Sequence, residues 1–278
     1  MAPTCFDVEI TDKVAHVRLS RPDELNTMTA AFWRELPEIV TRISDEASAR
    51  VVVISSTGKH FSAGMDLAVF ANTDLTGEPA ELGRKQARMR SNAKVLQWSF
   101  TALEKARVPV LAAVQGGVIG GAVDLVTACD VRYASADAFF CVQEINIGMT
   151  ADVGTLQRLG KLVPEGFARE MAFTGRRVSA ARAYDVGLVS EVYTDHDALV
   201  SGVLDTAREI ASKSPLAIWG TKVAMNYARD HSVDASLEQI ATWQAGMFQP
   251  DDMAEAFTAK AEKRAAVFGE LLPEPRGL

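Results

Sequence analysis

The sequence predicts an α/β fold, with a core rich in parallel strands followed by a helical C-terminal region. Two short runs at 51–54 and 108–114 are rich in β-branched residues, which is typical of strands buried on both faces. Helical segments alternate with the predicted strands over the first two-thirds of the 278 residues, as they do in parallel sheets. From about residue 198 only helices are predicted. We therefore expect a core over residues 1–197 and a helical region over residues 198–278.

The core begins with a hairpin and a capped helix. Apolar residues at 8–10 and 14–19 lie on either side of a polar Thr-Asp-Lys turn, a pattern that predicts two antiparallel strands. Thr29 is suited to cap a helix whose apolar residues, from Phe32 to Ile43, recur at helical spacing. The strands at 51–54 and 108–114, a helix over 121–128 and weaker strands at 131–134 and 139–142 complete the core.

The C-terminal region predicts four helices, at 198–213, 215–229, 235–248 and 251–269. Two of the breaks between these helices contain proline, at Ser214-Pro215 and Gln249-Pro250. The tail is rich in large apolar side chains, among them Trp243, Met247, Phe248, Phe257 and Phe268. These side chains would let it pack on its own core or on another subunit.

Composition excludes several classes of function. The net charge of −7 gives no general attraction for nucleic acid or anionic lipid. Three cysteines without CxxC spacing and four scattered histidines indicate neither a disulfide framework nor a metal site. No uncharged apolar run reaches 18 residues, so no membrane span is expected. The sequence also lacks secretory, transit and peroxisomal signals, and we expect a cytoplasmic protein.

Two glycine-containing segments follow the predicted buried strands. The first is FSAGMDL at 61–67, and the second is GGVIGGAVDLVTACD at 116–130, which carries a single acid, Asp124, in its apolar run. A strand, a glycine turn and a helix N-terminus together favour negative charge. The residues alone allow a phosphate loop or an oxyanion hole, although neither nucleotide fingerprint is present. A serine hydrolase is not expected, because no GxSxG motif occurs.

Together these segments resemble the signatures of the enoyl-CoA hydratase/isomerase, or crotonase, superfamily. The resemblance continues through QEINIG, TLQRL and FTGR and covers roughly residues 6–265. It implies a crotonase-like ββα spiral core, a helical C-terminal trimerisation region and an acyl-CoA thioester substrate, with no cofactor or metal. By position it implies Ala63 and Gly121 as the oxyanion-hole donors. It also implies that Ala63, Gly64, Met65, Asp66, Leu67 and Gly121 bind CoA, and that the protein is a homotrimer or a dimer of trimers.

Three acids point to one subgroup. A hydratase of this superfamily has two glutamates at the positions of Asp124 and Glu144, whereas here the first is Asp and a third acid follows at Asp152. This set resembles the Δ3,5-Δ2,4-dienoyl-CoA isomerases, which implies conversion of 3,5-dienoyl-CoA to 2,4-dienoyl-CoA in fatty acid β-oxidation. The implied roles are Glu144 at C2, Asp152 at C6 (or the reverse) and Asp124 as an electrostatic partner. The alternatives are an enoyl-CoA hydratase or a non-catalytic acyl-CoA- or RNA-binding relative.

Simpler structural roles for these residues remain open at the level of sequence. Asp124 would pair with Arg132 or Arg158 if it were only a helix acid. Asp152 would cap a helix beginning near Val153, as Asp does well. The basic stretch at 84–94 is either a solvated helix face or a surface that binds a phosphorylated ligand.

Overall fold

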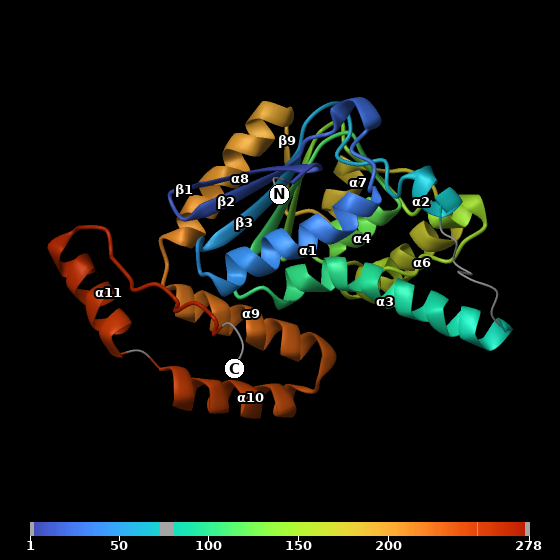
Figure 1. Cartoon of the computed structure of the whole chain (residues 1–278). Coiled ribbons are helices and arrows are strands. Elements are labelled where there is room, and N and C mark those ends of the chain that lie inside the picture. The colour runs from blue at the N-terminus through green and yellow to red at the C-terminus, as the bar shows by residue number, and fades with distance from the viewer. Residues whose placement is uncertain (1–2, 73–80, 249, 276–278) are drawn as a thin grey trace.

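A six-stranded sheet forms the centre of the molecule. The computed structural model describes residues 3–72, 81–248 and 250–275. The strand order is β1-β2-β3-β4-β6-β9, with β1 antiparallel to β2 and all other neighbours parallel (Figure 1). The bounds are β1 (Phe6–Thr11), β2 (Val14–Leu19), β3 (Val51–Ser56), β4 (Val110–Val114), β6 (Val131–Ser135) and β9 (Glu191–Tyr193). The predicted hairpin and both predicted buried strands are confirmed.

A second sheet of three short strands lies next to the candidate site. Its order is β5-β7-β8, with β5 (Gly117–Ile119) parallel to β7 (Phe139–Cys141) and β7 antiparallel to β8 (Val178–Ser179). Gly117 follows β4 after only two residues, so the chain passes from the main sheet into the small one at the glycine-rich segment. This change of sheet brings the segment to the mouth of the cavity described below.

Both faces of the main sheet are covered by helices. On one face, Val52, Ile54, Ala112 and Val114 belong to the core cluster that holds the buried face of α1 (Ala30–Asp45). On the other face, the alternate residues of the same strands, such as Val53 and Leu111, pack with the apolar face of α8 (His196–Ala211). Because successive strand residues point to opposite faces, these strands are continuous apolar runs. The predicted cap at Thr29 is confirmed, since its hydroxyl accepts from the Phe32 amide.

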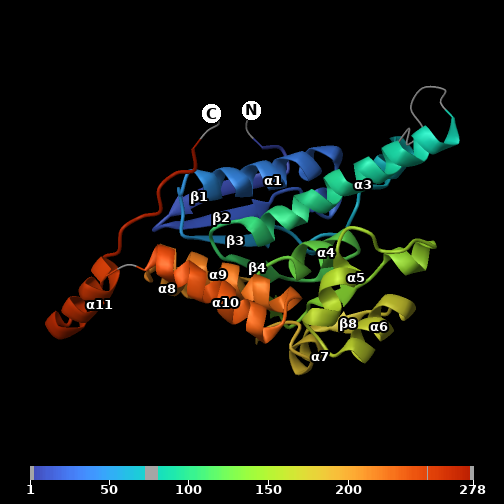
Figure 2. The same ribbon diagram turned by 90° about the horizontal axis from the view of Figure 1, so that it is seen from below.

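The remaining helices of the core surround the small sheet and the cavity. Their bounds are α2 (Leu67–Asn72), α3 (Leu82–Lys105), α4 (Gly121–Thr127), α5 (Thr155–Arg158), α6 (Glu165–Thr174) and α7 (Ala180–Asp185). Single 3-10 turns are η1 (Pro22–Glu24), η2 (Glu144–Ile147) and η3 (Leu159–Lys161). The N-terminal half of α3 extends past the body of the molecule (Figure 2).

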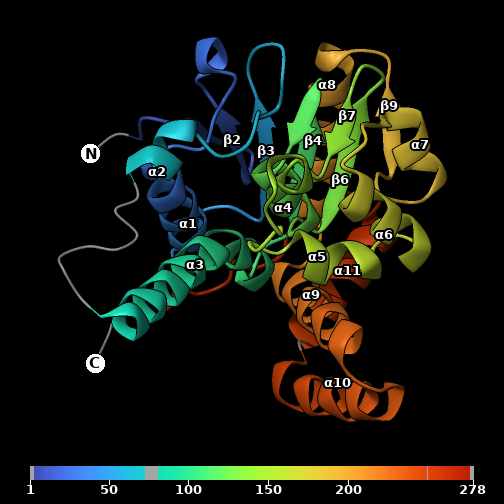
Figure 3. The same cartoon turned by 90° about the vertical axis from the view of Figure 1, so that its right-hand side faces the viewer.

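The four predicted C-terminal helices are present, with one correction. They are α8, α9 (Pro215–Asp230), α10 (Val233–Met247) and α11 (Pro250–Glu262), and α10 lies farthest from the sheet (Figure 3). The last helix ends at Glu262 rather than at 269, because Lys263 adopts a positive φ of 54°. The division of the chain at residue 197 stays a prediction, although α8 itself packs on the sheet. No helix in the described ranges is both long and apolar enough to span a membrane.

Candidate active site

The glycine turn before α4 brings a carboxylate against the backbone. Gly120 has φ +55° and ψ −123°, a conformation that essentially only glycine adopts. A β-carbon on Gly120 would lie 3.2 Å from Oε1 of Glu144. The absence of a side chain at Gly120 therefore serves two purposes, because it permits the turn into α4 and leaves room for the Glu144 carboxyl group.

The FSAGMDL segment lies directly beside this turn. Gly64 has φ +87°, and a β-carbon there would lie 2.6 Å from the Ile119 carbonyl oxygen and 3.5 Å from the Gly121 nitrogen. The two segments are thus in backbone contact, as an oxyanion hole built from one amide of each requires.

The structure corrects one of the two predicted donors. The Ala63 amide already donates to the Leu25 carbonyl at 3.0 Å, so it is not available to a ligand. The Gly64 amide donates to the Ser62 hydroxyl and the Asp66 amide to the Met28 carbonyl. Within the described part of the chain, the amides of Met65 and Gly121 make no hydrogen bond, and both residues line one cavity.

This cavity has a volume of about 350 Å³ and brings together four of the predicted site residues. Its walls are largely apolar and come from α1 (Trp33), from the face of α3 that carries Met89, Ala93 and Leu96, and from Met149. Glu144 and Asp152 also line it, together with Met65 and Gly121. Two acids and two unbonded amides in one apolar chamber are the polar groups that acid/base chemistry beside a carbonyl needs.

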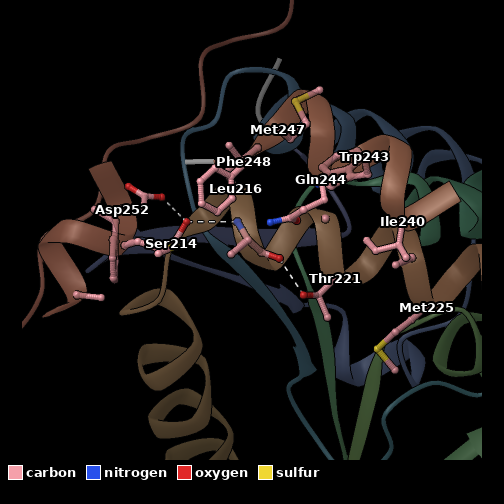
Figure 4. A pocket seen from close by; sticks show the side chains of 16 residues that line it. Ser214, Leu216, Thr221, Met225, Ile240, Trp243, Gln244, Met247, Phe248 and Asp252 are labelled. Carbon is pink, nitrogen blue, oxygen red and sulfur yellow. Dashed lines mark hydrogen bonds between the residues drawn. The ribbon is translucent and has the colours of Figure 1, made fainter. Parts of the chain in front are cut away.

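Larger hollows exist elsewhere, but neither Glu144, Asp152 nor the Met65 and Gly121 amides line them. The groove between α9, α10 and α11 has a volume of about 590 Å³ and is lined mainly by apolar side chains. In Figure 4, Trp243, Met247 and Phe248 lie around it, and the Ser214 hydroxyl donates to Asp252 at its edge. Its size therefore does not make it the active site, because Asp252 is the only acid among the described residues that line it, and Asp252 accepts from Ser214.

Asp124 lies behind the cavity and is fully buried. Its Oδ1 accepts a 2.6 Å hydrogen bond from the Thr155 amide, while Oδ2 has no partner in the described chain. Burial raises the pKa of Asp124 to about 6, against the lowering effect of the Thr155 amide and side chain. Neither predicted arginine pairs with it, because Arg132 donates to backbone carbonyls and Arg158 pairs with Glu104 at 2.6 Å.

Glu144 begins the turn η2, with its carboxyl group partly buried. Oε2 is shielded from solvent and has no hydrogen-bond partner in the described residues. Burial and the charges of Asp124 and Asp152 together raise the pKa of Glu144 to about 7. At neutral pH this carboxyl group can therefore give or take a proton with little free-energy cost.

Asp152 differs from the other two acids because its side chain is exposed at the cavity wall. Its backbone carbonyl accepts from the Gln97 side chain of α3 at 2.8 Å. The alternative role of Asp152 as a helix cap is not borne out. Helix α5 begins at Thr155, after Gly154, and the Thr155 amide is satisfied by Asp124 instead. The Asp152 carboxylate is thus left to face the cavity.

The family is decided by comparison with known proteins. The model of the enoyl-CoA hydratase/isomerase family matches residues 9–271, nearly the whole chain. The chain belongs to the enoyl-CoA hydratase/isomerase family. A mouse protein named mitochondrial Δ(3,5)-Δ(2,4)-dienoyl-CoA isomerase is 44% identical, covering 90% of this chain and 77% of the relative. A peroxisomal protein of that name from Arabidopsis thaliana is 40% identical, with 93% of each chain covered.

Solved structures agree on the fold of this family member. The crystal structure of an enoyl-CoA hydratase from Bacillus anthracis has a TM-score of 0.83 and 28% identity, with 95% of this chain and 99% of that chain covered. The superfamily and the dienoyl-CoA isomerase subgroup, both recognised from motifs, are therefore confirmed, as is the α/β fold with its helical C-terminal region.

The comparisons overturn the expected location. The relatives at 44% and 40% identity are named mitochondrial and peroxisomal, which contradicts the cytoplasmic assignment made from sequence signals. Composition and charge reflect solubility rather than compartment, so they carried no information on this point.

The residues of the predicted CoA-binding segment have different surroundings in this family member. Met65 lines the cavity, and Leu67 is 78% exposed beside it. Asp66 has structural partners, because Oδ2 accepts from the Thr27 hydroxyl and Oδ1 from the Ala68 amide. The basic stretch at 84–94 forms the exposed part of α3. Among the residues described, no cluster of three or more His, Cys, Asp or Glu could hold a metal ion.

Three residues of the site were missed by sequence reasoning. Trp33 forms a cavity wall, Gly120 leaves space for Glu144, and Thr155 is the partner of Asp124. Met65 was predicted to bind CoA, but not as an amide donor. Gly120 offered a signal, as one of two adjacent glycines before a helix. Trp33 and Thr155 offered none, since their contacts join segments that are distant in the sequence.

Proposed function

We propose that this protein is an isomerase that converts 3,5-dienoyl-CoA thioesters to 2,4-dienoyl-CoA in fatty acid β-oxidation. The observation that carries the proposal is the pair Glu144 and Asp152 on one apolar cavity, with the third acid, Asp124, buried behind them. The names of relatives at 40–44% identity support the same activity.

The reaction moves one proton from C2 to C6 of the acyl chain. Glu144 removes a proton from C2, and the electron pair spreads through both double bonds onto the thioester oxygen as a dienolate. Asp152, which takes up a proton from solvent before this step, then donates it to C6, so that the double bonds end at C2–C3 and C4–C5. Loss of the C2 proton from Glu144 to solvent restores the starting state. Two separate carboxyl groups suit this reaction, because the proton leaves and enters at positions four carbons apart.

The dienolate oxygen would bind the amides of Met65 and Gly121. Both amides are unbonded in the described chain and belong to the two segments that touch at Gly64. Removal of a single oxyanion donor in other enzymes costs about 10²–10³ in kcat, so these two groups supply a large share of the rate.

Asp124 acts through its charge rather than by carrying a proton. It does not line the cavity, and one of its oxygens is held by the Thr155 amide. Its charge is one of the causes that raise the pKa of Glu144 to about 7. A general base with a pKa near the working pH combines a sufficient ionised fraction with useful basicity.

The alternative function, hydration of 2-enoyl-CoA, fits the site less well. Holding one water between two acids requires both carboxyl groups to face the cavity, but Asp124 is completely buried. The arrangement therefore favours proton transfer between Glu144 and Asp152 over water addition.

A substrate panel tests the proposal. Purified protein is given 3,5-dienoyl-CoA and 2-enoyl-CoA of matched chain lengths, and each reaction is followed by absorbance. We expect rapid formation of the conjugated 2,4-dienoyl thioester and slow hydration at every length. Rapid hydration without dienoyl conversion would refute the assignment.

We also propose that the protein forms a homotrimer, or a dimer of trimers, through its C-terminal helices. Large apolar side chains are exposed along them, including Met225 (69%), Val233 (74%) and Phe257 (68%). A second copy of the chain is the occupant we assign to the groove of Figure 4, because such exposure is costly for a monomer. Light scattering should give a multiple of three chains, and Phe257→Asp should lower it. Phe173→Asp, at an equally exposed position on α6, is the control.

A further inference from the structure

Thr155 is the residue that holds the buried carboxyl group of Asp124 in place. Thr155 is completely buried, and its amide makes the 2.6 Å bond to Oδ1 of Asp124. Helix α5 has no side-chain cap of its own, because the preceding residue is Gly154. A carboxylate from α4 therefore occupies the place of a capping side chain, and the two helices are joined at the active site.

The Thr155 hydroxyl is the second part of this contact. Oγ1 is buried and makes no hydrogen bond of normal geometry in the described chain, and the same is true of Oδ2 of Asp124. The hydroxyl nevertheless lies close enough to the carboxyl group to lower its pKa. A buried hydroxyl normally has a partner, and the Asp124 carboxyl group is the buried acceptor on which the Thr155 side chain acts.

The loop that carries Thr155 is held rigidly from the other side. The Arg158 guanidinium packs on Gly154 so closely that a β-carbon there would lie 1.7 Å from Nη1. Arg158 pairs with Glu104 of α3 at 2.6 Å, and Glu104 also pairs with Arg229 of α9. Thr155 is thus attached to α3 as well as to α4, and it has little freedom to move away from Asp124.

We infer that Thr155 is a positioning residue of the proposed isomerase, whose amide and hydroxyl together keep Asp124 ionised and directed toward Glu144. The inference rests on the proposed function only for its kinetic consequence. The charged and titratable groups around Asp124 are Arg158 of α5, Asp152 of the preceding loop and Glu144 of η2. Of these, Arg158 favours the ionised form and Asp152 opposes it, so the neutral Thr155 adds to the effect of Arg158.

Removal of the hydroxyl has a predictable direction. Thr155→Val keeps the shape and the amide but loses the O–H donor, so the pKa of Asp124 should rise. Less charge on Asp124 then lowers the pKa of Glu144, and the acidic limb of the kcat/KM profile should move to lower pH. Because a base of lower pKa accepts the C2 proton less readily, kcat should fall about tenfold, with little change in KM.

The test compares three variants with the wild-type enzyme. Thr155→Val removes the hydroxyl, whereas Thr155→Ser keeps it. The control Thr127→Val removes a different buried hydroxyl, which lies on α4 and donates only to backbone carbonyls. Infrared difference spectra at several pH values follow the protonated carboxyl band, and Asp124→Asn identifies the band of Asp124. The same proteins are assayed for dienoyl conversion across pH.

We expect Thr155→Val alone to raise the pH at which Asp124 protonates and to lower kcat. An unchanged Asp124 titration in Thr155→Val, or equal effects of the Val and Ser variants, would overturn the inference. If Thr155→Val does not fold, Thr155→Ala takes its place with the same criteria. A wild-type enzyme inactive on 3,5-dienoyl-CoA would refute the proposed function instead, while the infrared titration would still decide the role of Thr155.

Discussion

Gly120 and Glu144 are in such close contact that the site accepts no larger residue at position 120. An added β-carbon would meet Oε1 of Glu144 at 3.2 Å, and the backbone at Gly120 has a conformation that other residues avoid. The position of the proposed base thus depends on a residue without a side chain, in the turn that also leads to the Gly121 amide.

Replacement of Gly120 should therefore displace the base. We expect Gly120→Ala to lower kcat about 100-fold, because a displacement of about 1 Å at a reacting group has effects of that size. The matched control is Gly160→Ala, where an added β-carbon meets no atom within 4 Å among the described residues. Steady-state kinetics of both variants provide the comparison, and equal activities would contradict the role of Gly120.

Asp152 should be required for turnover but not for folding. Its side chain is exposed at the cavity, so Asp152→Asn should leave the melting temperature nearly unchanged while kcat falls about 10²–10⁴-fold. Asp185→Asn, an exposed change on α7, serves as the control. Turnover of Asp152→Asn within a few-fold of wild type would show that another group delivers the proton to C6.

The acidic limb of the pH profile should report Glu144. The base must be ionised to accept the C2 proton, so kcat/KM should decline as the pH falls through about 7, the pKa of Glu144. Asp124→Asn removes a negative charge that raises this pKa, and the limb should move to lower pH. Profiles that coincide for the variant and the wild type would argue against the electrostatic role of Asp124.

Asp124 should also make stability depend on pH. Its pKa rises from 3.8 to about 6 on folding, so the folded state holds this proton more tightly than the unfolded chain. The protonated group stabilises the fold below about pH 4, and this stabilisation is lost as the pH rises to about 6. It contributes about 3 kcal/mol to the free energy of unfolding. We therefore expect the free energy of unfolding of Asp124→Asn, measured with urea and taken relative to wild type, to be higher at pH 8 than at pH 4. A difference independent of pH would count against a buried, titrating Asp124.

Replacement of one backbone N–H group tests whether Met65 or Ala63 donates to the thioester oxygen. Incorporation of the α-hydroxy analogue of methionine at position 65 replaces the amide N–H by an ester oxygen. We expect kcat to fall about 10²–10³-fold with little loss of stability. The same replacement at Ala63 breaks the bond to the Leu25 carbonyl and should affect stability more than kcat. The reverse pattern would restore Ala63 as the donor.

Local patterns in the sequence predicted the framework well. The hairpin, the doubly buried strands and the cap at Thr29 depend on neighbouring residues and on a pattern of period two or 3.6, all of which are visible in the sequence. The acids Glu144 and Asp152 were placed on one cavity through the family motif.

The errors lie where a distant segment decides the outcome. Which amide of the FSAGMDL segment remains unbonded depends on the carbonyls of Leu25 and Met28, far earlier in the chain. The start of α5 depends on Asp124 of α4 rather than on a neighbouring cap, and the sequence alone could not decide against Asp152 as that cap. Such pairings follow from tertiary packing, which no local pattern encodes.

The central claim is that Glu144 and Asp152 transfer protons at opposite ends of a dienolate. The most direct test is to convert 3,5-dienoyl-CoA in D₂O and to analyse the product by mass spectrometry and NMR. The predicted product is 2,4-dienoyl-CoA of unchanged skeleton with one deuterium at C6. A product that has gained the elements of water, or unchanged 3,5-dienoyl-CoA, would contradict it.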